Sequence, residues 1–198
     1  FTEHTQITRS DGRKCAAGEI KVGDELLVPS HDGIEASTTS VVAIIKETGN
    51  TRNRRVYDMG DDCFITGDHP VYIDGLWHRS SDIFPGCMRT NTLVNFVTHD
   101  NLPFAANDNT VLSFGGYAHN LDKANTTDPI SMIYTFRVNN IPYAFVHLRK
   151  FLGLSSDCNT IHSSPDRIDA GLSHAAQVAR NGVACMSTYV GENVMRCF

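Results

Sequence analysis

A threonine and a histidine lie three residues apart in the segment Ile65-Thr66-Gly67-Asp68-His69-Pro70-Val71-Tyr72, which joins two apolar runs. On a strand–turn–strand this spacing can bring a hydroxyl and an imidazole to the same side of a backbone group. The hydroxyl can form a hydrogen bond with a peptide group, and the imidazole can donate a proton near neutral pH. We therefore expect Thr66 and His69 to act together on one peptide bond, which could belong to the protein itself.

Short β-strands are expected to position this pair. The turn residues between apolar runs include Asp11-Gly12 and Asp74-Gly75, which are common in hairpins. No helix-length apolar pattern separates the runs, as repeating β–α–β units would require. The first 120 residues are therefore predicted to be mainly β. The predicted strands are residues 25–29, 40–45, 56–59, 63–66, 71–73, 93–98 and 110–114.

The pattern changes after residue 120. Residues 122–129 are polar and resemble a linker, and the apolar runs 130–138 and 141–148 flank Asn139-Asn140, which predicts a hairpin. Ser164-Pro165-Asp166 then combines an N-cap, a first-turn proline and a first-turn acid, which predicts the start of a helix. Apolar residues recur at helical spacing beyond it and are expected to pack on a core. The glycines at positions 171 and 182 predict one interrupted helix or two.

The composition argues against some classes of partner. Of the 198 residues, 41% are hydrophobic and 20% are charged, which is ordinary for a globular domain. A net charge of −5 and a pI near 6.0 give no support for binding nucleic acid or an anionic membrane. No apolar run reaches the roughly 18 residues of a membrane span. We expect a soluble protein with no nucleic-acid partner and no membrane span, in an undetermined compartment with the cytoplasm slightly favoured over secretion.

The six cysteines, at positions 15, 63, 87, 158, 185 and 197, form no C-x-x-C pair and are too sparse for a disulfide scaffold. Free thiols are the preferred interpretation. A zinc site could be assembled from Cys63, His69, His78 and Cys87, but their spacings are wider than those of a zinc finger. We therefore predict no metal and no cofactor.

Three blocks of sequence point to a known superfamily. Each alone would be weak evidence, but together the first two are fairly specific. The blocks are the opening Ile7-Thr8-Arg9-Ser10-Asp11-Gly12 with the later Val22-Gly23-Asp24-Glu25-Leu26-Leu27, the T-x-x-H block of Thr66 and His69, and the stretch from residues 93–98 to His119-Asn120.

In this order and spacing, the chain resembles the Hint superfamily of inteins, bacterial intein-like domains, Hedgehog C-terminal autoprocessing domains and their Vint relatives. The resemblance covers residues 1–120 and is closest in character to the Vint, Hedgehog-type and bacterial intein-like members. It implies a horseshoe-like, pseudo-two-fold all-β domain. Residues 121–198 would then be a C-terminal α+β extension.

The resemblance also implies self-processing chemistry. A Hint domain begins with a cysteine or serine that attacks the carbonyl of the preceding peptide bond, and with cysteine this N→S acyl shift gives a thioester. Thr66 and His69 match the family's T-x-x-H motif. There the histidine protonates the scissile amide nitrogen, and the threonine hydrogen-bonds and strains that amide. Asn95 lies where many inteins carry an aspartate, a departure that looks more Vint-like.

Both ends of the expected reaction depart from a complete intein. Hedgehog-type domains begin with Cys-Phe, so the nucleophilic cysteine is expected immediately before Phe1, and the chain is expected to be a fragment or processed piece. His119 and Asn120 resemble the family's C-terminal pair, in which the asparagine cyclises. However, Leu121 follows where splicing needs Cys, Ser or Thr. N-terminal cleavage or thioester formation is therefore expected in preference to full splicing.

The expected function is single-turnover autoproteolysis, or ligation to a nucleophile, at the bond before that upstream cysteine. The partners would be the chain's own N-terminal precursor segment and a small nucleophile or an acceptor protein. Two alternatives stay open, namely an inactive Hint-fold interaction module and full splicing with Asn120 cyclisation. Residues 121–198 could recognise the adduct or, as we prefer, cover an open edge of the β domain.

Overall fold

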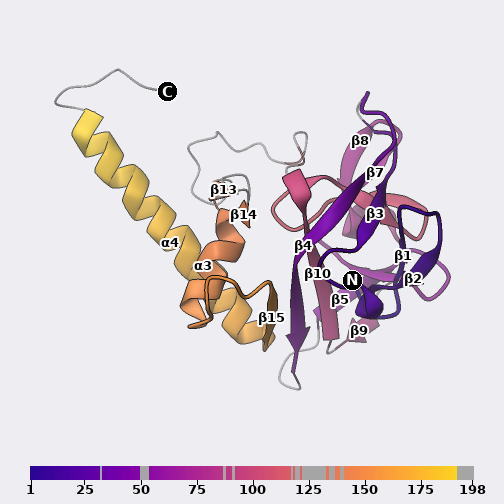
Figure 1. The fold of residues 1–198 in the computed structure, drawn as a ribbon, viewed down its shortest axis with the longest axis horizontal. Coiled ribbons are helices and arrows are strands. Elements are labelled where there is room, and N and C mark those ends of the chain that lie inside the picture. The colour runs from indigo at the N-terminus through magenta and orange to yellow at the C-terminus, as the bar shows by residue number, and fades with distance from the viewer. Residues whose placement is uncertain are drawn as a thin grey trace.

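Strands form most of the N-terminal part of the chain, and two helices dominate the C-terminal part (Figure 1). The computed structural model describes residues 1–31, 33–49, 54–86, 88–90, 92–116, 118, 121, 133, 137–138 and 141–190. Every strand predicted from the sequence overlaps an observed one, and the prediction of a mainly β fold is confirmed. The N-terminal strands are β1 (Gln6–Thr8), β2 (Lys14–Ala16), β3 (Glu25–Val28), β4 (Ser37–Thr48), β5 (Arg54–Asp58), β6 (Phe64–Thr66), β7 (Pro70–Ile73), β8 (Leu76–Arg79), β9 (Met88–Thr90), β10 (Thr92–Thr98), β11 (Phe104–Ala106) and β12 (Asn109–Val111).

The described N-terminal strands form three sheets, one of which is built around the long strand β4. One sheet has the order β2-β1-β11-β12-β7-β8, and a second has the order β6-β5-β9. In the third, β4 pairs with β10 and with β3 in antiparallel fashion. Short connecting helices are η1 (Ala17–Glu19), α1 (Ser80–Ile83) and η2 (His99–Asn101). These sheets bring β6, β10 and the start of β7 into one region. Thr66 lies on β6, Asn95 lies on β10, and His69 directly precedes β7.

The Asp74-Gly75 turn shows how the sequence sets this register. Both residues have positive φ, 50° and 85° respectively, as a two-residue type I′ hairpin requires. The turn pairs Tyr72 with Trp77 and leads back to Pro70, which pairs with Arg79. The start of β7, directly after His69, is therefore fixed by a local turn signal.

Phe1 belongs to the main apolar core of the β region. Its side chain is fully buried, and its ring centroid lies 5.6 Å from that of Phe104 and 6.2 Å from that of Phe96. Burying a phenylalanine stabilises a fold by about 1.5–3 kcal/mol. Because Phe1 is anchored in this way, a residue that preceded it would be attached to a point inside the core.

The C-terminal part forms the predicted α+β extension, with one correction. A hairpin does form, from β13 (Arg137–Val138) and β14 (Ile141–Pro142), but most of the predicted strand 141–148 belongs to helix α3 (Tyr143–Phe151). The helix forms because Phe145 and Leu148, one turn apart, both face the apolar cluster that covers β4. A short apolar run cannot distinguish these two outcomes.

Helix α4 (Pro165–Val190) begins where predicted but is continuous, so the predicted interruption was wrong. Gly171 lies where α3 and α4 touch, and a Cβ atom there would approach Leu148 Cδ1 to 2.6 Å. The glycine therefore serves close helix packing instead of ending the helix. Among the described residues, no helix is both long and apolar enough to cross a membrane.

The extension packs against the edge of β4. Strand β15 (Thr160–Ser163) pairs with β4 in parallel, from Thr160 opposite Ile44 to Ser163 opposite Glu47. Figure 1 shows α3 and α4 beyond this edge, with α4 running away from the β region. The extension thus occupies a sheet edge that would otherwise be open, which is the structural role preferred from the sequence.

Candidate active site

The segment from Thr66 to His69 forms a tight turn between β6 and β7. The backbone N–H of His69 donates to the carbonyl oxygen of Thr66 at 3.0 Å, which closes the turn. Gly67 is needed within it, because a Cβ atom there would lie 2.5 Å from Cε2 of Tyr57. The turn holds Thr66 and His69 at the two ends of one short loop, the arrangement that their spacing predicts.

His69 is positioned as a neutral base. Its Nε2 atom lies 2.7 Å from the carbonyl oxygen of Leu112. A carbonyl can only accept, so Nε2 carries the proton and Nδ1 keeps a lone pair. Burial, and then the positive charge of the Phe1 amino group, lower the pKa of His69 to about 3. One edge of the side chain still lines a cavity, but the protein atoms around the ring set its proton affinity.

This protonation state refines the role expected from the sequence. A free histidine could donate a proton near neutral pH. The structure instead gives His69 a ring that must first accept a proton at Nδ1 before it can donate one. The residue can therefore still act as an acid, but only after it has acted as a base.

Phe1 places the start of the chain beside this ring. The ring centroids of Phe1 and His69 are 4.7 Å apart. The Phe1 amino group donates to Val94 O at 3.1 Å, and Val94 N donates to Phe1 O at 2.8 Å. Such a reciprocal pair is the narrow pair of an antiparallel ladder. If the ladder continued, the residue before Phe1 would lie opposite Asn95.

The environment of the Phe1 nitrogen is poor in water. Burial lowers the pKa of this amino group to about 5, although Glu47 on β4 acts in the opposite direction. Glu47 is itself only 7% exposed. A chemical group at this position is therefore surrounded by protein, where hydrogen bonds and charges act more strongly than in water.

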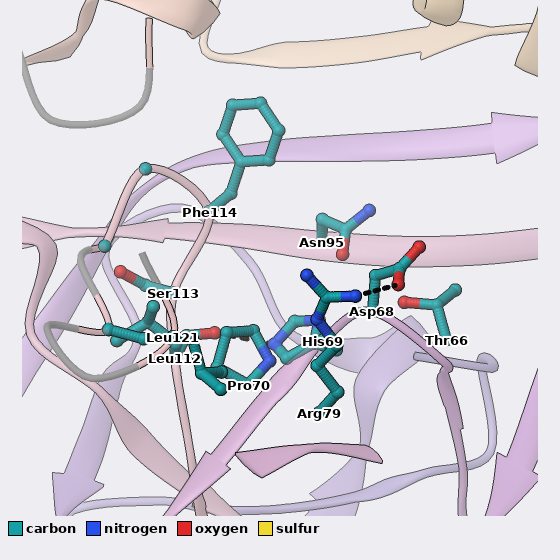
Figure 2. Close-up of a pocket in the computed structure, with 13 residues that line it drawn as sticks. Thr66, Asp68, His69, Pro70, Arg79, Asn95, Leu112, Ser113, Phe114 and Leu121 are labelled. Atoms are coloured by element: carbon teal, nitrogen blue, oxygen red, sulfur yellow. Dashed lines mark hydrogen bonds and ion pairs between the residues drawn. The ribbon is translucent and has the colours of Figure 1, made fainter. Parts of the chain in front are cut away.

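Asn95 lies on the same side as the T-x-x-H turn. It follows Val94 on β10, and Figure 2 shows its side chain beside Asp68, with Thr66 and His69 close by. Asp68 and Arg79 form an ion pair at 4.0 Å. Because both side chains are largely exposed, this pair contributes little to stability. It marks the rim of the site.

Two cavities meet at these residues. A cavity of about 460 Å³ opens beside His69 and is also lined by residues 112–116, 118 and 121. A second cavity of about 430 Å³ is closed on one side by Ile168, Asp169 and Leu172 of α4. The residues that line both cavities are Thr66, Asp68, Asn95 and Phe114.

Some predicted residues lie outside the described part of the chain. His119 and Asn120 are among them, together with Cys87 of the zinc alternative, although Ala118 and Leu121 line the first cavity. The boundary predicted between residues 120 and 121 falls at the same place. Within the described residues, no group of three or more His, Cys, Asp or Glu side chains could hold a metal ion. Cys15, Cys63 and Cys158 are free thiols.

Sequence reasoning missed the residues that hold the pair in place. The backbone carbonyl of Leu112 accepts a hydrogen bond from the His69 ring, and Tyr57 packs on Gly67. Ser80, at the start of α1, donates from its hydroxyl to the carbonyl oxygens of Thr66 and His69. A backbone acceptor leaves no trace in residue type, and a serine in the first turn of a short helix is an ordinary residue there.

No protein-family model matches the sequence, and no curated protein matches it. Among solved structures, the DnaB intein from Synechocystis is similar at 15% identity, over 57% of this chain and 96% of that one, with a TM-score of 0.44. A bacterial intein-like domain from Clostridium thermocellum is similar at 19% identity over the same shares, with a TM-score of 0.46.

Proposed function

We propose that this chain is a Hint-type self-processing domain that releases or transfers the segment before it. The reaction is an N→S acyl shift at a cysteine encoded immediately before Phe1. The observation that carries the proposal is the placement of Phe1. Its backbone is paired with Val94, and its ring lies against the ring of His69 in a tilted contact, with centroids 4.7 Å apart. The residue before it would therefore enter the region bounded by Thr66, His69 and Asn95.

The acid–base step follows from the tautomer of His69. Nδ1 can take the proton of the cysteine thiol, while Nε2–H stays bonded to Leu112 O. The thiolate attacks the carbonyl carbon of the residue before the cysteine, and the carbon–nitrogen bond breaks. The imidazolium returns its Nδ1 proton to the departing amide nitrogen, so the products are a thioester and a free amine.

Burial opposes the first of these proton transfers, from the thiol to the ring, and favours the second, from the ring to the leaving nitrogen. The low pKa of His69 means that its imidazolium gives up a proton readily to the leaving nitrogen. In the precursor a peptide nitrogen replaces the Phe1 ammonium, which removes the smaller of the two causes that lower this pKa. The larger cause, burial, remains.

Thr66 and Asn95 would bind the scissile peptide group. The Thr66 hydroxyl lies at the opposite end of the turn from His69, and both residues line the first cavity. Asn95 is the residue that faces the position before Phe1 if the ladder with β10 continues. Hydrogen bonds from these side chains can hold the amide in a geometry that favours attack.

The second cavity would admit the nucleophile that resolves the thioester. Thr66 and Asn95 line this cavity, and part of its wall is α4. Water, a small nucleophile or the side chain of an acceptor protein could enter there. In this view the extension shapes the approach to the thioester without supplying a reacting group.

The test is thiol-induced cleavage of a precursor. The full chain is expressed behind a reporter protein with a cysteine before Phe1, and dithiothreitol or hydroxylamine is added. We expect release of the reporter at that junction, slowed at least about 100-fold in His69→Ala, since acid–base catalysis contributes roughly 10²–10⁴-fold. A Cys→Ala change at the junction is the control and must abolish release. Absence of cleavage, or equal cleavage in His69→Ala, contradicts the proposal, as does a genomic codon before Phe1 for a residue other than Cys.

A further inference from the structure

Ser80 contacts the T-x-x-H turn at both of its ends. Its hydroxyl oxygen lies 2.5 Å from the carbonyl oxygen of Thr66 and 3.1 Å from that of His69. Its backbone N–H donates to the same His69 carbonyl at 3.0 Å. The Ser80 side chain is fully buried, so these bonds do not compete with water.

The neighbouring backbone extends this contact. The N–H of Ser81 donates to the carbonyl oxygen of Gly67 at 2.9 Å. The first N–H groups of a helix have no partner within the helix, and here two of them bind the turn. The carbonyl groups of Thr66, Gly67 and His69 are thereby all held by the start of α1.

Packing also restrains the turn. The ring of Tyr57 on β5 lies so close to Gly67 that a Cβ atom would come within 2.5 Å of it. Held by donors from α1 and packed against this ring, the peptide planes of the turn have little freedom to rotate. The directions in which Thr66 and His69 project from the backbone follow from those planes.

We propose that Ser80 is a positioning residue for the self-processing reaction. Its hydroxyl fixes the orientation of the Thr66 and His69 backbone and, through it, the placement of the threonine hydroxyl and the His69 ring. The effect on cleavage rests on the proposed function, but the effect on His69 does not. A small misplacement of a reacting group can cost roughly 100-fold in rate, so a residue that touches neither thiol nor carbonyl can still be required.

The test compares Ser80→Ala with a conservative and a matched variant. Ser80→Cys keeps a similar volume and a weak donor. Thr98→Val removes another buried hydroxyl, which donates to the backbone oxygen of Leu102 at 2.6 Å, away from the turn. Each variant is measured for thiol-induced cleavage per folded molecule, for thermal unfolding, and for the ¹⁵N resonances of the His69 ring.

We expect Ser80→Ala to slow cleavage about tenfold or more, with Ser80→Cys in between. Thr98→Val should lose stability but cleave within about twofold of the parent. In Ser80→Ala, the His69 resonances should shift away from those of a single neutral Nε2–H tautomer. The proposal is overturned if Ser80→Ala cleaves like Thr98→Val and leaves these resonances unchanged. If the parent itself does not cleave, the proposed function fails, and the His69 resonances still decide whether Ser80 positions the ring. Should Ser80→Ala not fold, Ser80→Cys decides by the same criteria.

Discussion

The β region and the C-terminal extension contribute to the site in different ways. Thr66, His69 and Asn95 all come from strands of the β region or the turn between them, and Phe1 belongs to the same core. Among the described residues of the extension, Leu121 lines the first cavity, and three side chains of α4 form part of the wall of the second. The reactive groups thus come from one region, and the shape of the approach comes partly from the other.

The two regions nevertheless share a core. Ala43, Ile45 and Val97 of the β sheet pack in one cluster with Phe145 and Leu148 of α3, Ile161 of β15 and Ile168 of α4. A region that supplies no reactive group can therefore still support the region that does. Changes in the extension should therefore affect stability more than chemistry, whereas changes at the site in the β region can affect both.

The largest effect should come from Phe145→Ala. The side chain is fully buried at the junction, and truncating such a phenylalanine costs about 3–5 kcal/mol of unfolding free energy. Urea unfolding should be followed by the fluorescence of Trp77 in the β region and by helical circular dichroism. Both signals should shift together. If only the helical signal moved, the two regions would be independent units, and Phe151→Ala, at a side chain that is 42% exposed, is the control with a small effect.

Acid should separate the histidines of the two regions. The pKa of His69 is lowered to about 3, so the unfolded chain takes up a proton first as the pH falls. The contribution of His69 to the free energy of unfolding is complete above pH 6.5 and is lost towards pH 3. The loss between pH 7 and pH 5 amounts to about 2 kcal/mol. His69→Gln should remove this part of the dependence. His147 in α3, whose pKa burial also lowers, should contribute less, and an equal effect of His147→Gln would contradict the contrast.

Two tightly packed glycines offer a matched pair, one in each region. Gly67→Ala would meet Tyr57, and Gly171→Ala would meet Leu148. Such overpacking costs about 1–3 kcal/mol, but alanine regains up to about 1 kcal/mol within a helix. Gly171→Ala should therefore lose less stability than Gly67→Ala in thermal or urea unfolding, and only Gly67→Ala should slow cleavage.

The control for this pair is Gly182 in α4. No atom lies within 4 Å of a Cβ built there, so Gly182→Ala should stabilise the chain by about 0.5–1 kcal/mol through helix propensity alone. A loss of stability in this variant would show that alanine is unfavourable in α4 because of the local environment of the helix and not because of contact with α3.

The smallest effect should come from Asp169→Asn at the wall of the second cavity. Because this residue supplies no reacting group in the proposed reaction, thioester formation should stay within about threefold of the parent. The thioester and its hydrolysis product can be separated by mass spectrometry over time. A loss of thioester formation as large as that of His69→Ala would mean that the extension takes part in the chemistry.

The sequence was most informative where the decisive interactions are local. The Thr66–His69 spacing and the Asp74-Gly75 turn each depend on neighbours within a few residues, and both can be recognised from residue types alone. The start of α4 was equally visible, because Ser164 and Pro165 have helix-start preferences of their own. The spacing and the turn defined the strands that carry the candidate pair, and the helix-start residues defined the beginning of α4.

What could not be predicted depends on contacts between distant segments. Leu112 lies 43 positions from His69, and its carbonyl alone sets the tautomer of the ring. The pairing of Phe1 with Val94 spans 93 positions. The neutral state of His69 also required knowledge of burial, which no local pattern provides. The continuity of α4 through Gly171 needed the position of α3.

The parallel pairing of β15 with β4 has a consequence for the order of events during synthesis. Strand β4 ends at Thr48, but its partner on one edge begins only at Thr160. Pairings between distant segments form late, because closing the intervening loop costs entropy. While the ribosome is still translating the middle of the chain, β4 is therefore without one neighbour and the wall of the second cavity is missing. The second cavity therefore takes its final shape only after residues 160–172 have left the ribosome.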